Sequence, residues 1–562
     1  GFGAYGSAAT KRRDWSYSRS SLRIVGWLRR QWMALAAAIH PIGLVALLIS
    51  FTYLIWIALA QYAALPHIYD ASAYLFGAKI FAQGHVWAPV PAAADRFNGP
   101  FMVAQDGKWF TQYEPGTSLM LALGVALGAP WMVEPLLGTL SLLGIGLIAH
   151  RLYDRRVATL AVLLGAISPL YSYIAASYLS HAVAVFFLVW GFWALQRAMM
   201  EYPTRRSVWL LPLAAALWVM AAFTRQTSVV FAVVSLAGLL WLAWVDYWPA
   251  LHPHWLRRWI APALAVAALL FVAMVVYSAL NMALTGLPNV TPRTLYLPSD
   301  HWGFGQGVGF YGAHTLGSGF ITVDELLTSL AIDLFGWPFY LSLALLLIPF
   351  LTRRAQPADY VMLLGACAMT FAFVGYFYAG IYLGPRYLYD ALPFFLILTA
   401  RGFMALAQVG AAARLNGLTW RDQRALPSPA IGAPAWASAL SLTTTLAALL
   451  VVCWAGYFMP RQVALHTEFS GMGADRSVTP RLLINPPLHH AIVVTDDIQL
   501  YGYTLFSMND PSLRGNVIYA FGESSYDYAE LAHAYPDRSL YVLSIDPDGS
   551  PRYTPINPAQ SP

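Results

Sequence analysis

The 562-residue chain has too few charges to cover a water-soluble protein of its size: 58% of the residues are hydrophobic and 11% are charged, against about 25% charged residues in soluble domains. The net charge of +6 comes from short basic clusters between apolar runs, a topology signal that argues against a nucleic-acid partner. Cys367 and Cys453 lie in apolar stretches, which excludes a disulfide framework or a cysteine metal site. These features predict a polytopic membrane protein.

Eleven apolar runs are long enough to cross a hydrocarbon core of about 30 Å. They lie at 42–61, 132–151, 157–175, 180–199, 208–223, 228–246, 260–283, 330–351, 358–379, 386–406 and 438–459. The run 117–128 is shorter and predicts a re-entrant or interfacial helix. The basic segment 1–41 lacks a cleavage site of small residues, so we interpret the first run as an uncleaved anchor.

The distribution of Lys and Arg predicts an N-terminus in the cytoplasm. Most of the 33 basic residues fall in one set of alternate segments or at the adjoining helix ends. Those segments are 1–41, 152–156, 200–207, 247–259, 352–357 and 407–437. The external loops contain only Lys79, Arg96, Lys108, Arg225, Arg293 and Arg386. Because basic residues concentrate in cytoplasmic loops, and because the number of spans is odd, the C-terminus is expected outside.

Three regions follow along the chain. Residues 1–41 form a cytoplasmic basic segment, 42–459 a transmembrane body with long external loops at 62–131 and 284–329, and 460–562 an external tail. The tail has short strand-like runs at 491–495, 516–519 and 540–543 and a helical pattern at 526–535. The predicted fold is an all-α membrane protein with about eleven transmembrane helices and a small C-terminal α/β domain outside the membrane.

The first external loop contains two candidate carboxylates. Asp70 directly follows the first span, where partial desolvation raises a carboxyl pKa towards that of a general base; capping of the following helix explains its position equally well. Glu114 precedes a Pro-Gly break and lies either at the mouth of a cavity or in a solvated loop. His181 opens the fourth span on the external side, where a histidine is more often a packing residue than a ligand.

Two arginines stand apart from the cytoplasmic clusters. Arg225 occupies the external turn between the fifth and sixth spans, and Arg386 opens the tenth. Arginines at membrane level usually have a partner. Asp390 follows Arg386 at i+4, which is typical of a structural ion pair, whereas Arg225 has no carboxylate close in sequence. The functional alternative is an anion site, because guanidinium binds phosphate with two parallel hydrogen bonds.

The second long external loop contains Asp300 and His301, followed by glycines at alternate positions from Gly303 to Gly309. A dinucleotide-binding loop would need a strand before it and a helix after it, and this context is missing. We interpret the segment as a glycine-rich flap over a cavity.

Taken in order, these motifs resemble a known family. An early external Asp, Tyr-Glu-Pro-Gly before Leu-Met-Leu-Ala-Leu-Gly, an external Ser-His, a Thr-Arg turn and a late Gly-Pro-Arg-Tyr are similar to bacterial GT-C-fold glycosyltransferases. The branch they resemble includes the protein O-mannosyltransferases and the lipid A aminoarabinose transferase. The likeness covers about 40–410, and the tail is only loosely similar.

The resemblance implies an inverting transferase in the bacterial plasma membrane. It would move a sugar from a polyprenyl-phosphate donor to a hydroxyl of a glycan, lipid or protein at the outer face. Asp70 matches the catalytic base. The donor phosphate is expected at Arg225, Arg386 and Lys79, and further substrate contacts are expected at Tyr74, Tyr113, Glu114, His181, Asp300, His301 and Tyr387. No cofactor is required, although a divalent Mg or Mn ion near Asp70, Glu114 and His181 is compatible with the sequence.

Two departures from the family leave alternatives open. Ala71 stands where the mannosyltransferases often have an acidic residue, and Pro115 stands where the aminoarabinose branch has Lys. One alternative is a transporter or flippase for a lipid-linked saccharide, which would have functional polar residues near the bilayer midplane. The other is a non-catalytic membrane subunit that retains the fold as a scaffold.

Overall fold

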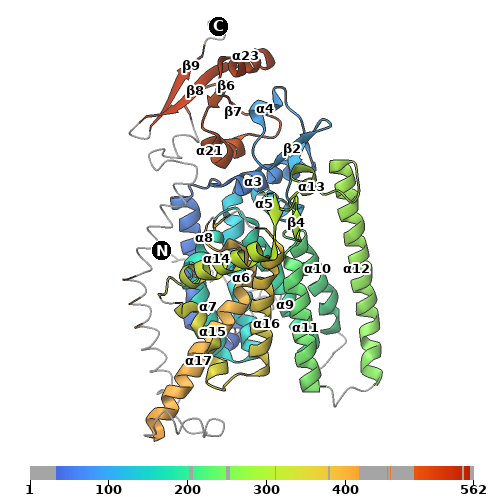
Figure 1. Ribbon diagram of the computed structural model, residues 1–562, viewed down its shortest axis with the longest axis vertical. Coiled ribbons are helices and arrows are strands. Elements are labelled where there is room, and N and C mark those ends of the chain that lie inside the picture. The colour runs from blue at the N-terminus through green and yellow to red at the C-terminus, as the bar shows by residue number, and fades with distance from the viewer. Residues whose placement is uncertain are drawn as a thin grey trace, which may run out of the picture.

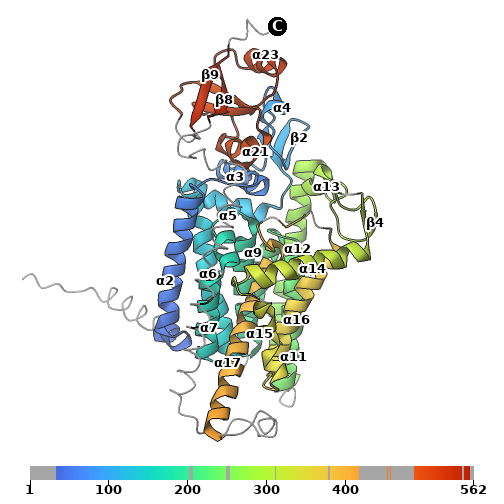
Figure 2. The ribbon, with the colours of Figure 1, turned by 60° about the vertical axis from the view of Figure 1, so that its left-hand side comes forward.

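The computed structural model describes residues 33–200, 207–247, 253–416 (without 311, 339, 378, 379 and 382), 486–546 and 550–556, and the single positions 448, 452 and 456. Its main body is a bundle of long helices that run roughly parallel to one axis (Figure 1). A smaller unit with strands lies beyond one end of the bundle, and both views show the segment of α3 between the two (Figure 2).

The bundle is built from apolar helices, and the described buried side chains of all of them except the helix at 253–285 form one continuous core. These helices are α2 (Pro41–Trp56, extended by a π-helical turn Ile57–Gln61), α6 (Val133–Leu152), α7 (Arg155–Ile167), α8 (Pro169–Ile174), α9 (Ser180–Met200), α10 (Leu210–Ala222), α11 (Ser228–Tyr247), α12 (Pro253–Thr285), α14 (Leu316–Asp333), α15 (Leu341–Leu351), α16 (Pro357–Phe371) and α17 (Leu392–Asn416).

Seven of the expected spans are helices long and apolar enough to cross a membrane. They are Pro41–Gln61, Pro130–Leu152, Ser180–Met199, Ser228–Val245, Trp259–Thr285, Pro357–Gly375 and Arg386–Val409. The expected span 208–223 is the shorter apolar helix α10, and 438–459 lies outside the described residues except at isolated positions. The count of eleven spans therefore stays a prediction.

Two expected spans are not single helices. The run 157–175 is divided into α7 and α8 because Pro169 has no N–H to continue the helix and its ring clashes with the preceding turn. Ser168 ends α7 and caps α8 by accepting a hydrogen bond from the Tyr171 N–H at 3.2 Å. The run 330–351 is divided at 334–340, between α14 and α15. Continuous apolar sequence therefore does not guarantee a continuous helix.

The two long external loops contain short elements of their own. The first has α3 (Tyr69–Ala82), α4 (Ala94–Phe97), a small antiparallel sheet β1–β3–β2 and the predicted short helix α5 (Pro115–Ala126). Its strands are β1 (Ala88–Pro89), β2 (Met102–Gln105) and β3 (Lys108–Thr111). The second has α13 (Pro292–Tyr296) and a hairpin of β4 (Gly305–Gln306) and β5 (Ala313–His314).

The C-terminal domain, residues 486–556 as far as described, has the α/β structure expected from its sequence. Strand β6 (Ala491–Thr495) pairs in parallel with β7 (Val517–Phe521) and β8 (Ser539–Ile545), and β9 (Pro551–Pro555) runs antiparallel to β8. Helix α23 (Ser525–Ala534) connects β7 to β8 and begins with a capping box between Ser524 and Asp527. A helical segment after β6 comprises α21 (Ile498–Leu500), the π-helix Tyr501–Leu505 and α22 (Phe506–Met508).

Helix α3 belongs to two cores at once. Ala73, Phe76 and Ile80 of α3 lie in one buried apolar cluster with residues of the C-terminal domain. Polar contacts reinforce this packing, because the Ser72 hydroxyl donates to the Tyr503 carbonyl and the Lys79 ammonium donates to the Ser507 carbonyl at 2.6 Å. On its other side α3 packs against α5 and the bundle. The C-terminal domain therefore helps to fix the position of α3.

The end of the bundle away from α3 has its own buried ion pair. Arg401 donates to both oxygens of Asp359, at 3.0 and 3.1 Å, and to the Arg354 carbonyl at 3.2 Å. Tyr153 also donates to Asp359, at 2.8 Å. These contacts bring together the turns at 153–156 and 352–359, which the sequence assigns to the cytoplasmic side. Arg401 lies nine residues along α17 from Leu392, or roughly 14 Å.

Candidate active site

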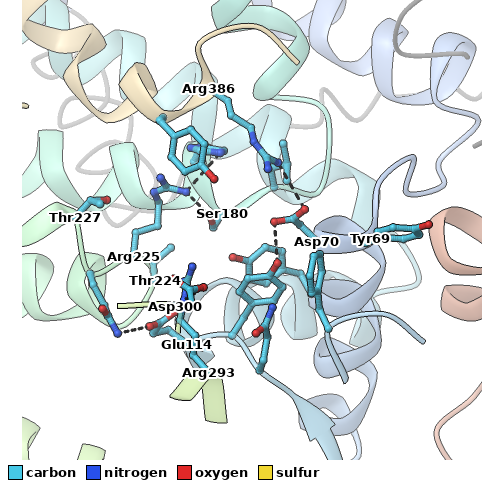
Figure 3. A pocket seen from close by; sticks show the side chains of 18 of the residues that line it. Tyr69, Asp70, Glu114, Ser180, Thr224, Arg225, Thr227, Arg293, Asp300 and Arg386 are labelled. Atoms are coloured by element: carbon cyan, nitrogen blue, oxygen red, sulfur yellow. Dashed lines mark hydrogen bonds and ion pairs between the residues drawn. The ribbon is translucent and has the colours of Figure 1, made fainter. Parts of the chain in front are cut away.

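A cavity of about 320 Å³ lies at the end of the bundle nearest α3. Residues from both external loops, several helix ends and the C-terminal domain form its wall. The lining residues are Ile68, Tyr69, Asp70, Tyr74, Phe101, Gln112, Tyr113, Glu114, Leu179, Ser180, His181, Thr224, Arg225, Gln226, Thr227, Arg293, Asp300, Trp302, Phe310, Tyr376, Phe377, Arg386, Tyr387 and Tyr503. Figure 3 shows part of this set from close by.

Asp70 lies in the first turn of α3 and faces the cavity. The positive end of the helix dipole favours a negative charge at this position. Its Oδ1 accepts a hydrogen bond of 2.8 Å from the Tyr113 hydroxyl, and its Oδ2 lies 3.6 Å from Nη1 of Arg386. Burial, together with the charge of Asp70, raises the pKa of Tyr113 well above its usual value, so the phenol keeps its proton and donates it. Asp70 is therefore a carboxylate with one firm hydrogen bond and one loose ion pair.

A tight turn directs Arg386 into the cavity. Gly384 has φ +66°, and a Cβ at this position would come within 2.9 Å of Oδ2 of Asp333, so a side chain there is strained and crowded. Pro385 follows, and Arg386 begins the 3₁₀ turn Arg386–Ala391 that leads into α17. The Arg386 guanidinium also lies over the Tyr387 ring, 5.6 Å from its centre.

Arg225 forms an ion pair with Asp390, the residue that follows Arg386 at i+4 in sequence. Its Nε donates to Oδ2 of Asp390 at 3.1 Å, whereas Arg386, for which the sequence left open a pairing with Asp390 or an anion site, pairs with Asp70. The i+4 spacing expected to join that pair belongs to a regular α-helix, whereas residues 386–391 form a 3₁₀ turn. Arg386 pairs with Asp70 and Arg225 with Asp390, so each ion pair joins segments that are distant in sequence.

Ser180 and His181 complete the surroundings of Arg225. Its Nη1 donates to the Ser180 hydroxyl at 3.1 Å and lies 3.4 Å from Nε2 of His181. Because a guanidinium can only donate, Nε2 of His181 must accept, and the proton of a neutral imidazole then sits on Nδ1. His181 is therefore a neutral neighbour of a bound cation at the start of α9.

Glu114 joins the short helix α5 to the turn before α11. Its Oε1 accepts a hydrogen bond of 2.7 Å from the Gln226 side chain. Pro115 occupies the first position of α5, where a missing N–H is tolerated. The Gly116 N–H donates to the Phe223 carbonyl at 2.7 Å. A Cβ on Gly116 would lie 2.8 Å from this carbonyl oxygen, so the Tyr-Glu-Pro-Gly motif needs glycine in the last place.

Arg293 is a third guanidinium in the wall, and the sequence interpretation did not assign it to the site. It donates through Nε to Asp300 at 2.7 Å and through Nη2 to the Tyr376 hydroxyl at 2.7 Å. Tyr376 in turn donates to the other oxygen of Asp300 at 2.7 Å. This closed triad ties the second external loop to the residue that ends the 3₁₀ turn Ala372–Gly375 after α16. Trp302 of the expected glycine-rich flap and Phe310, which directly follows it, also line the cavity.

Most of the residues expected at the site meet in this one cavity. Those that do are Asp70, Tyr74, Tyr113, Glu114, His181, Arg225, Asp300, Arg386 and Tyr387. Lys79 and His301 do not line it. Burial lowers the pKa of Lys79 to about 8, and its ammonium contacts carbonyls of the C-terminal domain, so its expected contact with a donor phosphate is wrong for this geometry. His301 is exposed and points Nδ1 at the Trp302 carbonyl.

The three residues considered for a divalent ion have other partners. Asp70 is engaged by Tyr113 and Arg386, and Glu114 by Gln226. Within the described part of the chain, no group of three or more His, Cys, Asp or Glu side chains has the arrangement of a metal site. A divalent ion at Asp70, Glu114 and His181 stays an untested expectation.

Comparisons with known proteins find structural similarity only at low sequence identity. No family model and no curated protein sequence matches the chain. Among solved structures, ArnT from Cupriavidus metallidurans in the apo state is 15% identical over 94% of both chains, with a TM-score of 0.49. ArnT bound to undecaprenyl phosphate gives 15% identity over 91% of this chain and 93% of that one, with a TM-score of 0.48. An archaeal oligosaccharyltransferase, AglB from Archaeoglobus fulgidus in complex with an inhibitory peptide and a dolichol-phosphate, is 14% identical over 90% of this chain and 69% of its own, with a TM-score of 0.46.

Both neighbours are GT-C-fold enzymes, the group whose motifs the sequence resembles. With 14–15% identity and TM-scores below 0.5, these similarities carry no argument about this chain. The chemical argument for this chain therefore depends on its own cavity.

Proposed function

We propose that this chain is a membrane glycosyltransferase that moves a sugar from a polyprenyl-phosphate donor to a hydroxyl acceptor, with inversion at the anomeric carbon. One observation carries the proposal. Asp70 from the beginning of the chain shares a cavity with Arg225 and Arg386 from much later. A base beside two guanidinium groups is what displacement of a phosphate leaving group by a hydroxyl requires.

The proposed reaction is a single displacement. The acceptor oxygen attacks the anomeric carbon, and a new C–O bond forms on the face opposite the phosphate. The bond between the anomeric carbon and the phosphate oxygen breaks, and its electron pair leaves with the polyprenyl phosphate. The acceptor proton passes to Asp70, so atoms and charge balance without nucleotide or redox partner. General-base assistance of this kind contributes about 10²–10⁴ in rate.

Arg225 and Arg386 have different tasks in this scheme. Arg225 is held by Asp390, Ser180 and His181, so it offers the phosphate a positive charge that is already in place. The contact of Arg386 with Asp70 is long, at 3.6 Å, in contrast to 3.1 Å for Arg225 with Asp390. An incoming phosphate therefore competes well for Arg386, and its binding would release the Asp70 carboxylate to accept the acceptor proton.

The location proposed for this reaction is the outer face of a bacterial plasma membrane, with the N-terminus in the cytoplasm. Arg401 of α17 donates to the carbonyl of Arg354, which lies in a basic turn, and α17 runs away from α3 towards the other end of the bundle (Figure 2). Since basic segments favour the cytoplasmic side, this separation supports an outward-facing cavity. It also favours the transferase over a transporter, whose charged groups are expected near the bilayer midplane.

The test is reconstitution of the purified protein in lipid nanodiscs with a panel of polyprenyl-phosphate-linked hexoses and pentoses. Release of polyprenyl phosphate and formation of a glycoside are followed by mass spectrometry, and NMR gives the anomeric configuration of the product. The proposal predicts turnover of at least one donor with inversion. Absence of turnover with every donor, or retention of configuration, would overturn it.

A further inference from the structure

One side of the cavity is formed by residues to which neither the proposed displacement nor phosphate binding gives a role. Tyr503, from the π-helix of the C-terminal domain, lies against Tyr69 of α3, with ring centres 4.2 Å apart. Phe101 from the first external loop packs edge-on against Tyr69 at 6.0 Å. Tyr69 and Tyr503 are both partly exposed. The C-terminal domain therefore supplies part of the cavity wall as well as support for α3.

Gln112 adds a polar group with no partner to this wall. Its side chain is 5% exposed and lines the cavity, and among the described residues its amide oxygen has no hydrogen-bond partner. Its backbone N–H donates to the Phe101 carbonyl at 3.0 Å, which keeps the two residues adjacent. A buried polar atom without a partner is energetically unfavourable. A ligand hydroxyl that donates to it would remove this penalty.

Phe101 is held in an unfavourable backbone conformation. Its φ is +65°, in the left-handed region that bulky residues rarely adopt. Its N–H donates to the Tyr296 hydroxyl at 3.3 Å, and its ring contacts Tyr69, Tyr113 and Tyr296. Strain of this kind persists where surrounding contacts impose it, and it is concentrated at ligand-binding positions.

The in-line displacement determines which substrate uses this wall. Figure 3 shows Arg225 and Tyr69 on opposite sides of Asp70. The leaving phosphate lies towards the guanidinium groups, so the acceptor must approach from the other side of the anomeric carbon. Its hydroxyl must also reach Asp70. Both conditions place the acceptor against Tyr69 and Tyr503.

The chemistry of the wall matches a sugar ring. A pyranose has a face of C–H groups, which packs on aromatic rings, and a rim of hydroxyls, which hydrogen-bond to fixed polar groups. Tyr69, Tyr503 and Phe101 offer the apolar surface, and the Gln112 oxygen offers an acceptor. We propose that these four residues form an acceptor subsite and that the acceptor is a saccharide. This inference rests on the proposed function for its direction of attack.

The first experiment separates acceptor binding from donor binding. Nanodisc-reconstituted protein is assayed with a saturating polyprenyl-phosphate sugar that supports turnover, against a panel of p-nitrophenyl glycopyranosides and a panel of Ser/Thr peptides. Transfer is expected to glycosides and not to peptides. Tyr503→Leu and Gln112→Met are each expected to raise the KM for the glycoside about tenfold, while the donor KM stays within twofold. Tyr503→Phe, which keeps the ring, is expected to restore the KM.

Tyr526→Leu is the matched control, because Tyr526 lies in the same domain and is 74% exposed. It is expected to behave as the parent chain. The inference is overturned if peptides are used and glycosides are not, or if Tyr503→Leu changes the donor KM and leaves the glycoside KM unchanged.

A second measurement does not depend on turnover. Isothermal titration of the p-nitrophenyl glycosides into the donor-free protein is expected to give binding that Tyr503→Leu weakens about tenfold and Tyr526→Leu leaves unchanged. If the glycosides bind but no donor is turned over, the proposed function is contradicted and the subsite is supported. If a donor is turned over but Tyr503→Leu leaves glycoside binding unchanged, the proposed function is supported and the subsite is contradicted.

Discussion

Replacing Asp70 with asparagine separates catalysis from stability, because the surroundings of Asp70 predict a small effect on folding. The asparagine carbonyl can still accept the Tyr113 hydroxyl, which lies 2.8 Å from Oδ1. The ion pair with Arg386 is lost, but it is 3.6 Å long and its partners are 12% and 23% exposed. Partly exposed pairs of this kind contribute about 0–1 kcal/mol. The free energy of unfolding should therefore fall by no more than about 1 kcal/mol.

The effect of Asp70→Asn on activity should be far larger. Loss of a general base costs about 10²–10⁴ in kcat, or roughly 3–5 kcal/mol of transition-state stabilisation. The measurement is kcat for sugar transfer in nanodiscs, together with denaturant unfolding in mixed micelles. Activity within tenfold of the parent chain would refute the assignment of Asp70 as base. A loss of activity accompanied by an equal loss of folded protein would refute the claim that its role is chemical.

Three further substitutions test the supports of the site, all by denaturant unfolding in mixed micelles. Gly116→Ala should cost about 1–3 kcal/mol, because its Cβ would press on the Phe223 carbonyl; unchanged stability would contradict the close approach. Asp390→Ala should cost about 3–5 kcal/mol by leaving the Arg225 guanidinium without its carboxylate, and Asp390→Asn should cost less. Lys79→Met should remove a pH dependence: burial lowers the folded pKa to about 8 from 10.5, so the parent chain gains up to about 1.4 kcal/mol per pH unit between pH 8 and 10.5. Parallel stability profiles of Lys79→Met and its parent over that range would show that Lys79 is not buried.

The sequence predicted the fold where a local pattern is sufficient. Most of the long apolar runs became long helices, and the alternating runs of the tail became strands β6, β7 and β8. It failed where a single residue overrides the pattern, as Pro169 does between α7 and α8. Hydropathy alone also gave no sign that 330–351 is divided, because the segment between α14 and α15 is itself apolar.

The residues of the site could be predicted where a charged side chain interrupts or borders an apolar run. Asp70, Glu114, Arg225 and Arg386 are charged groups at the edges of apolar runs. Their partners were not predictable, because each ion pair joins segments more than a hundred residues apart. Tyr503 gave no signal at all, since it is one tyrosine among 32 and reaches the cavity only through the docking of its domain.

The shared core of α3 and the C-terminal domain has a consequence for the biogenesis of the protein. Ser72 and its partner Tyr503 are 431 residues apart. At a synthesis rate of about 5–20 residues per second, roughly 20–90 s pass between their emergence from the ribosome. During that interval the apolar face of α3 has no tail to cover it. During synthesis, this helix must therefore contact either the lipid surface or a chaperone. A chain that is truncated before Tyr503 forms a bundle whose cavity lacks the wall from the C-terminal domain.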